Sequence, residues 1–234
     1  MADCSAFGDR AIIMLPSTRY GETCGQFLFL QGVRSLQMLI AFLRRFRLSC
    51  AHIMEVFTVE RKFLGICGSL RAASRNMGLL RCAAEVMPEG TSLELADISE
   101  LPFYSEDREK TASATLFLDK VRQAEGFVFA VAEYNYSVAP ALKNALDWAS
   151  REPGDILSGK KAALMGAGGG MGTSRAQYHL RQTCVYLDLR VLNRPEVFAN
   201  AFSDAFEANG SVSDTEEGRK LRAKVAALMQ ALCL

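Results

Sequence analysis

The chain has 234 residues, of which half are hydrophobic and 23% are charged. This composition provides a substantial core and argues against collagen, a repeat array or long-range disorder for the chain as a whole. The formal net charge of +1 lacks the basic surplus of a typical nucleic-acid-binding protein, so we expect no nucleic-acid partner.

The charge is unevenly distributed along the chain. Residues 1–54 carry six arginines, no lysine and only three acids. We therefore expect an N-terminal extension over 1–61 that precedes a separate domain over 62–234. Within the extension, residues 23–54 contain no acid between the basic residues Arg34, Arg44, Arg45 and Arg47. That composition suits an organellar targeting segment, and a disordered lineage-specific extension or a mis-assigned start codon suits it equally.

Seven cysteines lie at long, irregular spacings and only two histidines accompany them, which argues against a zinc site and predicts no metal centre. We expect free thiols in a reducing compartment and therefore a cytoplasmic protein, apart from any targeting by the extension. The longest clean apolar run is Met38–Leu43, far below the roughly 20 residues of a membrane-spanning helix, so no membrane span is expected.

Short apolar runs alternate with helical patterns from Lys62 onward. The strands are predicted at Phe63–Cys67, Ser92–Leu95, Gly126–Ala132, Lys161–Met165 and Arg190–Leu192, and the helices at Met77–Val86, Ala112–Ala124, Ala141–Ser150, 175 to about 187, and 214 to about 232. In the second helix we expect Leu116, Val121 and Ala124 to face inward, and in the third we expect Trp148 in the core.

This alternation predicts an α/β fold with a doubly wound, five-stranded parallel sheet of flavodoxin-like order 2-1-3-4-5 and helices on both faces. Ligands of such sheets bind at the carboxyl ends of the strands, near the point where the strand order reverses. The loops after the first, third and fourth strands should therefore surround one site.

The first of these loops runs from Gly68 to Asn76 and combines two hydroxyls, arginine and asparagine at the start of a helix. Such a loop can surround a phosphate with hydrogen-bond donors, although it also fits an ordinary polar loop in which Asn76 caps the helix. The second, residues 132–140, carries two tyrosines beside an asparagine. They could flank a flat heterocycle or simply pack the loop on the surface.

The third loop has glycine at five of the seven positions from Gly166 to Gly172. A ligand can lie directly on such bare backbone, although a flexible loop has the same composition. Its position after the fourth predicted strand favours a ligand-binding role.

The segments GSLRAASRN, EYNYSVAPALKNALDWASR and GAGGGMGTSRAQYHLRQ together resemble the NAD(P)H-dependent FMN reductase family, and in particular its quinone and chromate reductases. The resemblance covers roughly residues 62–227. It implies a flavodoxin-like fold, tightly held FMN, and NADPH or NADH as electron donor. It also implies dimers that pair into tetramers.

The resemblance assigns the cofactor contacts to three groups of residues. The phosphate loop falls on Ser69, Arg71, Ser74, Asn76 and Met77, the isoalloxazine turn on Glu133, Tyr134, Asn135 and Tyr136, and the glycine loop on Gly166, Gly168, Gly169 and Gly170. We further expect Phe103 and Tyr104 to line the substrate site and Arg175 either to recognise the 2′-phosphate of NADPH or to serve as a capping or ion-pairing residue.

Two positions depart from the family pattern. Ala132 replaces the usual proline before the Glu-Tyr-Asn turn, which predicts a looser turn. Gly166 replaces a frequent serine, which removes one side-chain hydrogen bond near the flavin.

The implied reaction is a two-electron, ping-pong hydride transfer through FMN N5 to a quinone or similar small acceptor. It requires no catalytic side chain, because the cofactor carries the chemistry. The alternative is a flavodoxin-type electron carrier without a nicotinamide site. Carriers of that kind are usually strongly acidic, and the small net negative charge of residues 55–234 favours them only weakly.

Overall fold

The computed structural model describes residues 10–16, 25–31 and 60–234. The chain divides between Glu60 and Arg61 into two units, and each is described by itself. In the first unit, strands β1 (Arg10–Pro16) and β2 (Gly25–Gln31) pair in antiparallel orientation, with Arg10 opposite Gln31. The four arginines between Arg34 and Arg47 that suggested targeting lie outside the described residues.

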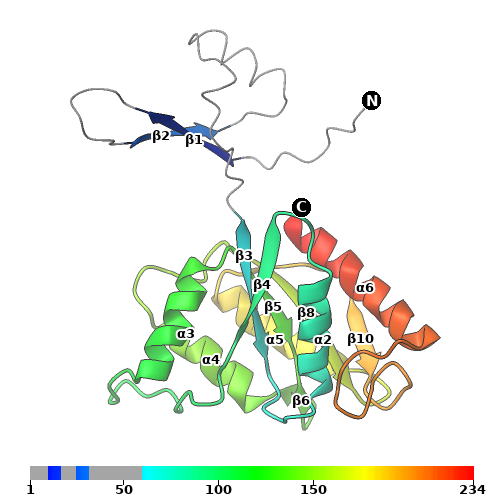
Figure 1. Ribbon diagram of the computed structural model, residues 1–234. Coiled ribbons are helices and arrows are strands. Elements are labelled where there is room, and N and C mark those ends of the chain that lie inside the picture. Colours follow the sequence, from blue (N-terminus) through cyan, green and yellow to red (C-terminus); the bar gives the residue numbers. More distant parts are fainter. Residues whose placement is uncertain (1–9, 17–24, 32–59) are drawn as a thin grey trace, which may run out of the picture. The chain divides into compact units, whose positions relative to one another are not determined.

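The second unit is a parallel sheet covered by helices (Figure 1). Its main strands are β3 (Arg61–Cys67), β4 (Thr91–Ala96), β5 (Gly126–Ala130), β8 (Lys161–Gly168) and β10 (Val197–Asn200). Its helices are α2 (Arg75–Glu85), α3 (Ala112–Gln123), α4 (Pro140–Ser150), α5 (Ser174–Tyr186) and α6 (Glu216–Cys233). The spatial order is β10-β8-β5-β3-β4 with every pair parallel, which confirms the predicted flavodoxin-like order.

The last strand of the sheet differs from the prediction. The segment predicted as the fifth strand forms only β9 (Arg190–Val191), which pairs with the first two residues of β8. The edge strand is β10 instead, and it pairs with the carboxyl-terminal half of β8, from Met165 to Gly168. Because β10 alternates buried and exposed residues, its short pattern is weaker than the fully buried run of β5.

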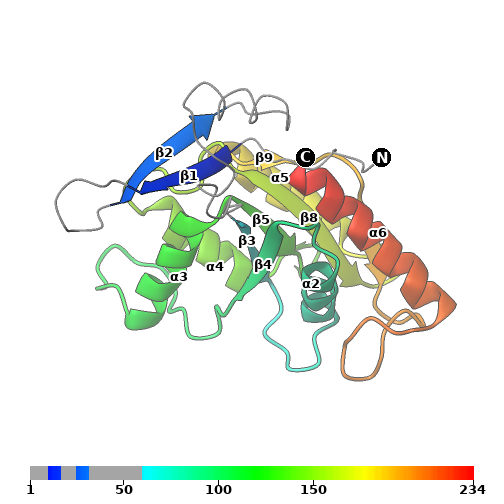
Figure 2. The ribbon, with the colours of Figure 1, turned by 45° about the horizontal axis from the view of Figure 1, so that its top comes forward.

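Two hydrophobic cores lie on opposite faces of the sheet. Helices α3, α4 and α5 cover one face, and α2 and α6 cover the other (Figures 1 and 2). Trp148 is buried as predicted, and its indole Nε1 donates a hydrogen bond to the Pro102 carbonyl. The inward assignment of Leu116 is wrong, because this side chain is 60% exposed while Phe117, Leu118 and Val121 fill the core.

Candidate functional site

Three loops meet at the carboxyl edge of the sheet. All main strands are parallel, so the loops that follow β3, β5 and β8 leave the sheet at one end. This end is the lower edge of Figure 1, where the short strand β6 (Glu133–Tyr134) lies. The common location of the three loops is as the sequence predicts.

The loop between β3 and α2 presents a row of backbone donors. Helix α2 begins at Arg75, two residues before the predicted start, and its N-cap is Ser74, whose hydroxyl accepts the Met77 N–H at 3.3 Å. Within the part of the chain that the structure describes, the N–H groups of residues 70–76 have no acceptor. The first turn of α2 contains no acid. These features together make the loop suitable for an anion with several oxygens.

Asn76 does not cap α2, as it would in an ordinary polar loop, because the N-cap residue is Ser74. Its side chain is buried, donates from Nδ2 to the Ala167 carbonyl at 3.0 Å and accepts the Ala167 N–H at 2.9 Å. This pair of hydrogen bonds joins the β3–α2 loop to β8, and thus two of the three loops to each other. Among the predicted phosphate-loop side chains, Arg71 is exposed and is free to reach a ligand, whereas Ser69 is buried.

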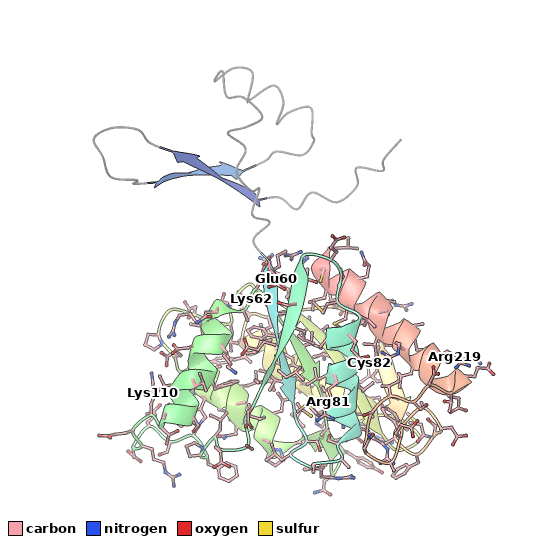
Figure 3. All side chains as sticks on the ribbon, in the orientation of Figure 1. Glu60, Lys62, Arg81, Cys82, Lys110 and Arg219 are labelled. Atoms are coloured by element: carbon pink, nitrogen blue, oxygen red, sulfur yellow. The ribbon has the colours of Figure 1, made fainter. Side chains whose placement is uncertain are left out.

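A cavity of about 340 Å³ opens beside this loop. Residues 69–72 form one wall and residues 95–99, at the end of β4, form the other, with Met77 and Arg81 contributed by α2 (Figure 3 labels Arg81). The Cys67 thiol at the cavity donates to the Ser69 carbonyl at 3.4 Å, and burial raises its pKa above the ordinary value. Cys67 therefore remains a thiol at neutral pH and is not an activated nucleophile.

Arg75 is a residue that the sequence analysis did not single out. Its Nε atom is buried and has no hydrogen-bond partner among the described residues, while its guanidinium lies 5.9 Å from the ring centre of Phe202. The position adds a second positive charge, besides Arg71, at the start of α2. The sequence signal that could have identified Arg75 is its place in a loop that already contains Arg71.

The segment after β5 forms a small hairpin of β6 and β7 (Ser137–Val138). Asn135 and Tyr136 at its tip have φ values of 50° and 65°, which is the backbone form of a tight two-residue hairpin turn. Tyr134 and Tyr136 are 49% and 64% exposed, so both rings are accessible at the site. Both interpretations of these rings, contact with a flat ligand and packing on the surface, stay predictions.

Helix α5 holds this hairpin in place. The N-cap residue of α5, Thr173, makes no capping hydrogen bond with its side chain, and Oε2 of Glu133 accepts the Ala176 N–H at 3.0 Å in its place. His179 Nδ1 lies 3.1 Å from the Ser137 hydroxyl, which adds a second link. Two side-chain contacts, at Glu133 and at His179, therefore link the hairpin to α5.

The glycine-rich segment separates into two parts. Glycines 166 and 168 belong to β8, and a Cβ at Gly166 would lie 1.9 Å from the Thr173 hydroxyl oxygen and 2.6 Å from the Val131 carbonyl oxygen. Thr173 is fully buried and occupies the space into which a serine at position 166 would project. By contrast, a Cβ at Gly169 or Gly170 would meet no neighbouring heavy atom within 4 Å. The tip of the segment is thus open to a ligand.

The residues predicted to line the substrate site take different positions. Phe103 is 72% exposed. The ring of Tyr104 packs edge-to-face against Trp148, with 5.2 Å between centroids, and its N–H donates to Asn144 Oδ1 at 2.8 Å. Arg175 lies in the first turn of α5 with its guanidinium 4.1 Å from the ring centre of Tyr136.

Among residues 10–16, 25–31 and 60–234, no helix is long and apolar enough to cross a membrane. No group of three histidine, cysteine or acidic side chains in these residues could hold a metal ion. The described cysteines, Cys67, Cys82, Cys184 and Cys233, are free thiols.

The chain resembles known proteins in both sequence and fold. The family model for NADPH-dependent FMN reductase matches residues 61–204. The chain is 47% identical over 171 residues to an NAD(P)H-dependent FMN reductase of Pseudomonas aeruginosa, covering 71% of this chain and 92% of the relative. It is 46% identical over 182 residues to an NAD(P)H:quinone oxidoreductase of Solanum tuberosum, covering 74% of this chain and 93% of the relative.

A solved structure has the same fold. The flavoenzyme NAD(P)H:(acceptor) oxidoreductase FerB of Paracoccus denitrificans superposes with a TM-score of 0.65 at 27% sequence identity. The superposition covers 74% of this chain and 97% of that structure.

Proposed function

This chain belongs to the NADPH-dependent FMN reductase family, and on that premise we propose that it reduces quinones or similar small acceptors with electrons from NAD(P)H. It is an FMN-dependent NAD(P)H oxidoreductase. One observation carries the proposal: the same edge of the sheet offers seven available N–H groups at residues 70–76 and an open glycine tip at Gly169–Gly170. The N–H groups suit a phosphate and the open backbone suits a flat ring.

The residues present fit FMN. The N–H groups of the β3–α2 loop and the exposed Arg71 would hold the phosphate, since no acid opposes them in the first turn of α2. The hairpin tip with Tyr134 and Tyr136 and the backbone of Gly169–Gly170 would bound the ring system. The buried Asn76 would position the first and third loops relative to each other.

When bound, FMN supplies the redox chemistry by accepting a hydride and delivering two electrons to an acceptor. The chain's own contribution is binding and orientation, because the cofactor carries the chemistry. A quinone that takes two electrons and two protons becomes a hydroquinone and can draw its protons from solvent. The relatives are named reductases and oxidoreductases, so the alternative of an electron carrier is not favoured.

Anaerobic stopped-flow spectroscopy tests the proposal. The holoprotein is mixed with NADPH and then, in a second mixing step, with a benzoquinone. We expect NADPH to bleach the flavin absorbance and the quinone to restore it. A flavin that NADPH leaves oxidised would refute the reductase assignment, and a reduced flavin that the quinone cannot reoxidise would refute the acceptor class.

We further propose that the chain assembles into a homodimer or homotetramer. Three large side chains on α5, Tyr178, Val185 and Tyr186, are between 55% and 81% exposed, which supports burial of this helix against another copy. Light scattering coupled to gel filtration should give a mass of two or four chains. A monomeric mass at micromolar concentration would contradict this part.

Residues 1–60 form an extension outside the reductase domain in this proposal. The family match and the second unit both begin at residue 61, and the acid-free arginine composition of residues 23–54 supports organellar targeting. We expect a fluorescent protein fused behind residues 1–60 to enter an organelle of the source cell, whereas uniform cytoplasmic fluorescence would contradict targeting.

A further inference from the structure

The cavity beside the β3–α2 loop lies apart from the place proposed for the flavin ring. In the sheet, β3 has β5 on one side and β4 on the other. The hairpin and the glycine-rich segment follow β5 and β8, whereas the cavity lies between the β3–α2 loop and the end of β4. Among the described residues, those that line it include none from the hairpin or the glycine-rich segment. The loop therefore separates this cavity of about 340 Å³ from the ring site.

Two arginines and one aspartate give the cavity its charge. Arg71 comes from the loop and Arg81 from α2, and both are exposed (Figure 3 labels Arg81). Neither arginine forms an ion pair within the part of the chain that the structure describes. On the opposite wall, hydrogen bonds from the N–H and hydroxyl of Ser99 lower the pKa of the Asp97 carboxyl, which is therefore ionised at neutral pH. The lining side chains thus carry a net charge of +1, which suits a monoanion.

Most of the remaining lining is apolar. It consists mainly of Leu70, Met77, Leu95 and Ile98. Met77 and Arg81 are four residues apart on α2, so they lie on the same face of this helix, beside each other. A flat aromatic ring suits such a pair, because a guanidinium stacks on aromatic faces and a thioether makes favourable contacts with ring edges. The volume is at the lower end of the range for ligand pockets, which corresponds to a ligand of about ten non-hydrogen atoms.

The Asp97 carboxylate selects a further group on the ligand. Its Oδ1 atom accepts both hydrogen bonds from Ser99, whereas its Oδ2 atom accepts none from the described residues. A carboxylate oxygen that lines a cavity favours a hydrogen-bond donor and repels a second anion. The ligand should therefore have a negative group at the arginines and a neutral donor, such as a hydroxyl, at the other wall.

We propose that this cavity binds a small aromatic carboxylate that carries a hydroxyl group, and that the bound carboxylate competes with the phosphate of FMN for Arg71. Arg81 and Asp97 recognise the two ends of the ligand, and the apolar side chains contact its ring. The competition rests on the proposed function, which places the FMN phosphate at Arg71, whereas the binding itself does not. The consequence is a site through which an aromatic acid lowers the affinity of the chain for its cofactor.

Amide NMR spectra of the full-length apoprotein test the binding with three probes: 4-hydroxybenzoate, benzoate and acetate. We expect 4-hydroxybenzoate to bind with a Kd of about 1 mM or tighter, which is usual for ten non-hydrogen atoms. Benzoate lacks the hydroxyl and should bind several-fold more weakly, and acetate also lacks the ring and should bind more weakly still. The shift changes should occur at residues 69–72 and 95–99. Changes confined to residues 133–138 and 166–172 would overturn the proposal.

Variants of the two recognition residues separate the ends of the ligand. Arg81→Ala should weaken both aromatic probes by about tenfold, since a charge-assisted contact is lost, and Arg81→Lys should fall between it and the wild type. Asp97→Asn keeps an oxygen for Ser99 and places an amide donor at the free position. It should therefore reduce the affinity for 4-hydroxybenzoate to about that for benzoate and leave benzoate bound at least as tightly as before.

A matched control excludes a general effect of surface charge. Arg151→Ala removes an exposed arginine just after α4, outside the cavity, and should bind all three probes as the wild type does. If Arg81→Ala does not fold, Arg81→Lys and Asp97→Asn decide. Equal probe affinities in the wild type, Arg81→Lys and Asp97→Asn would overturn the proposal.

Fluorescence titration of the apoprotein with FMN and with riboflavin tests the competition. A concentration of 4-hydroxybenzoate about ten times its Kd should weaken FMN binding by about tenfold and leave riboflavin binding unchanged, because riboflavin has no phosphate. Acetate at the same concentration controls for ionic strength. In Arg81→Ala the factor by which 4-hydroxybenzoate weakens FMN should fall toward one. Equal weakening of FMN and riboflavin would place the probe at the ring site and overturn the proposal.

The two sets of measurements fail independently. If the chain binds no FMN, the proposed function fails, while the NMR titrations still decide whether the cavity binds an aromatic carboxylate. If FMN binds and its reduction by NADPH and reoxidation by a benzoquinone are normal, but the aromatic probes bind nowhere on the wild type, the cavity assignment alone fails.

Discussion

At Gly166 and Gly168, an added Cβ would come within 2.2 Å of a protein oxygen, whereas at Gly169 and Gly170 it would meet no neighbouring heavy atom within 4 Å. The first pair lies in β8, packed against Thr173 and the backbone of the following turn, and the second pair forms the tip beyond the strand. One run of glycines thus contains positions required for folding and positions left open for a ligand. The difference teaches that a glycine run must be divided by its contacts before a binding role is assigned.

The largest effect is expected at Gly166. Introducing serine places a Cβ against the Thr173 hydroxyl and the Val131 carbonyl, and the second of these is backbone that cannot rotate away. Gly166→Ser should destabilise the apoprotein by about 2–3 kcal/mol and lower Tm by roughly 5–10 °C. Differential scanning calorimetry of the apoprotein measures this change.

A second substitution checks the cause of that loss. Thr173→Ala removes the hydroxyl contact but not the Val131 contact, so the double variant should recover only part of the lost stability. If Gly166→Ser alone leaves Tm unchanged, the division of the glycine run is wrong.

The opposite behaviour is expected at the tip. Gly170→Val should leave the Tm of the apoprotein within about 1 °C, because the new side chain meets no protein atom, and should weaken FMN binding by about tenfold. Gly170→Ala should produce a smaller change in the same direction. Fluorescence titration of apoprotein with FMN measures both. A Tm loss without a change in FMN affinity would place Gly170 with Gly166 and remove the distinction.

The sequence predicted where these loops lie but not which contacts their individual residues make. The buried run of β5 and the alternation of strands and helices were sufficient for the strand order, since a parallel sheet requires such runs. The end of β8 could not be predicted, because Gly166 has no apolar side chain to continue the pattern. The buried Thr173 that explains this glycine is a contact that only packing reveals.

Other errors have the same physical origin. The inward face of α3 is set by Ala114, Phe117, Leu118 and Val121, which follow helical spacing, and Leu116 falls on the other side of that face. Asn76 suited a phosphate contact or a cap on sequence alone, yet its amide pairs with both polar groups of Ala167, 91 residues away. Such long-range hydrogen bonds have no local sequence signal.

Glu133 is an intermediate case. It belongs to the predicted isoalloxazine turn, but its carboxylate accepts a hydrogen bond from the first turn of α5. Glu133→Gln keeps a hydrogen-bond acceptor for the Ala176 N–H and removes the negative charge at the helix N-terminus. We expect a loss of about 0.5–1 kcal/mol in the unfolding free energy of the apoprotein, measured by urea denaturation. Glu106→Gln, at an exposed acid in the loop before α3, is the control and should have no effect. An unchanged stability for Glu133→Gln would mean that the hairpin support is electrostatically neutral.

The smallest effect is expected at Glu152, far from the glycine run in the chain. Hydrogen bonding to Lys110, together with the Arg122 ion pair, lowers the pKa of this carboxyl below its ordinary value. The ionised carboxylate therefore stabilises the folded state at pH values above its ordinary pKa of 4.5. This contribution is lost as the pH falls through the lowered pKa of the folded state.

Glu152→Gln should thus cost a few tenths of a kcal/mol at pH 7, and the difference from wild type should disappear in acid. Urea denaturation at several pH values between 7 and 3 measures the change. FMN affinity at pH 7 should stay constant in this variant, so a change in affinity would show that the α3–α4 region is coupled to the site.

The most direct test of the account is the equilibrium binding of FMN and riboflavin to the apoprotein. The two ligands share the ring system and differ only in the phosphate, which the N–H groups of residues 70–76 and Arg71 are placed to hold. The account predicts one FMN per chain and riboflavin binding at least about 100-fold weaker, because two or more charge-assisted hydrogen bonds are absent. Equal affinities for the two ligands, or no binding of FMN, would contradict the assignment of the site.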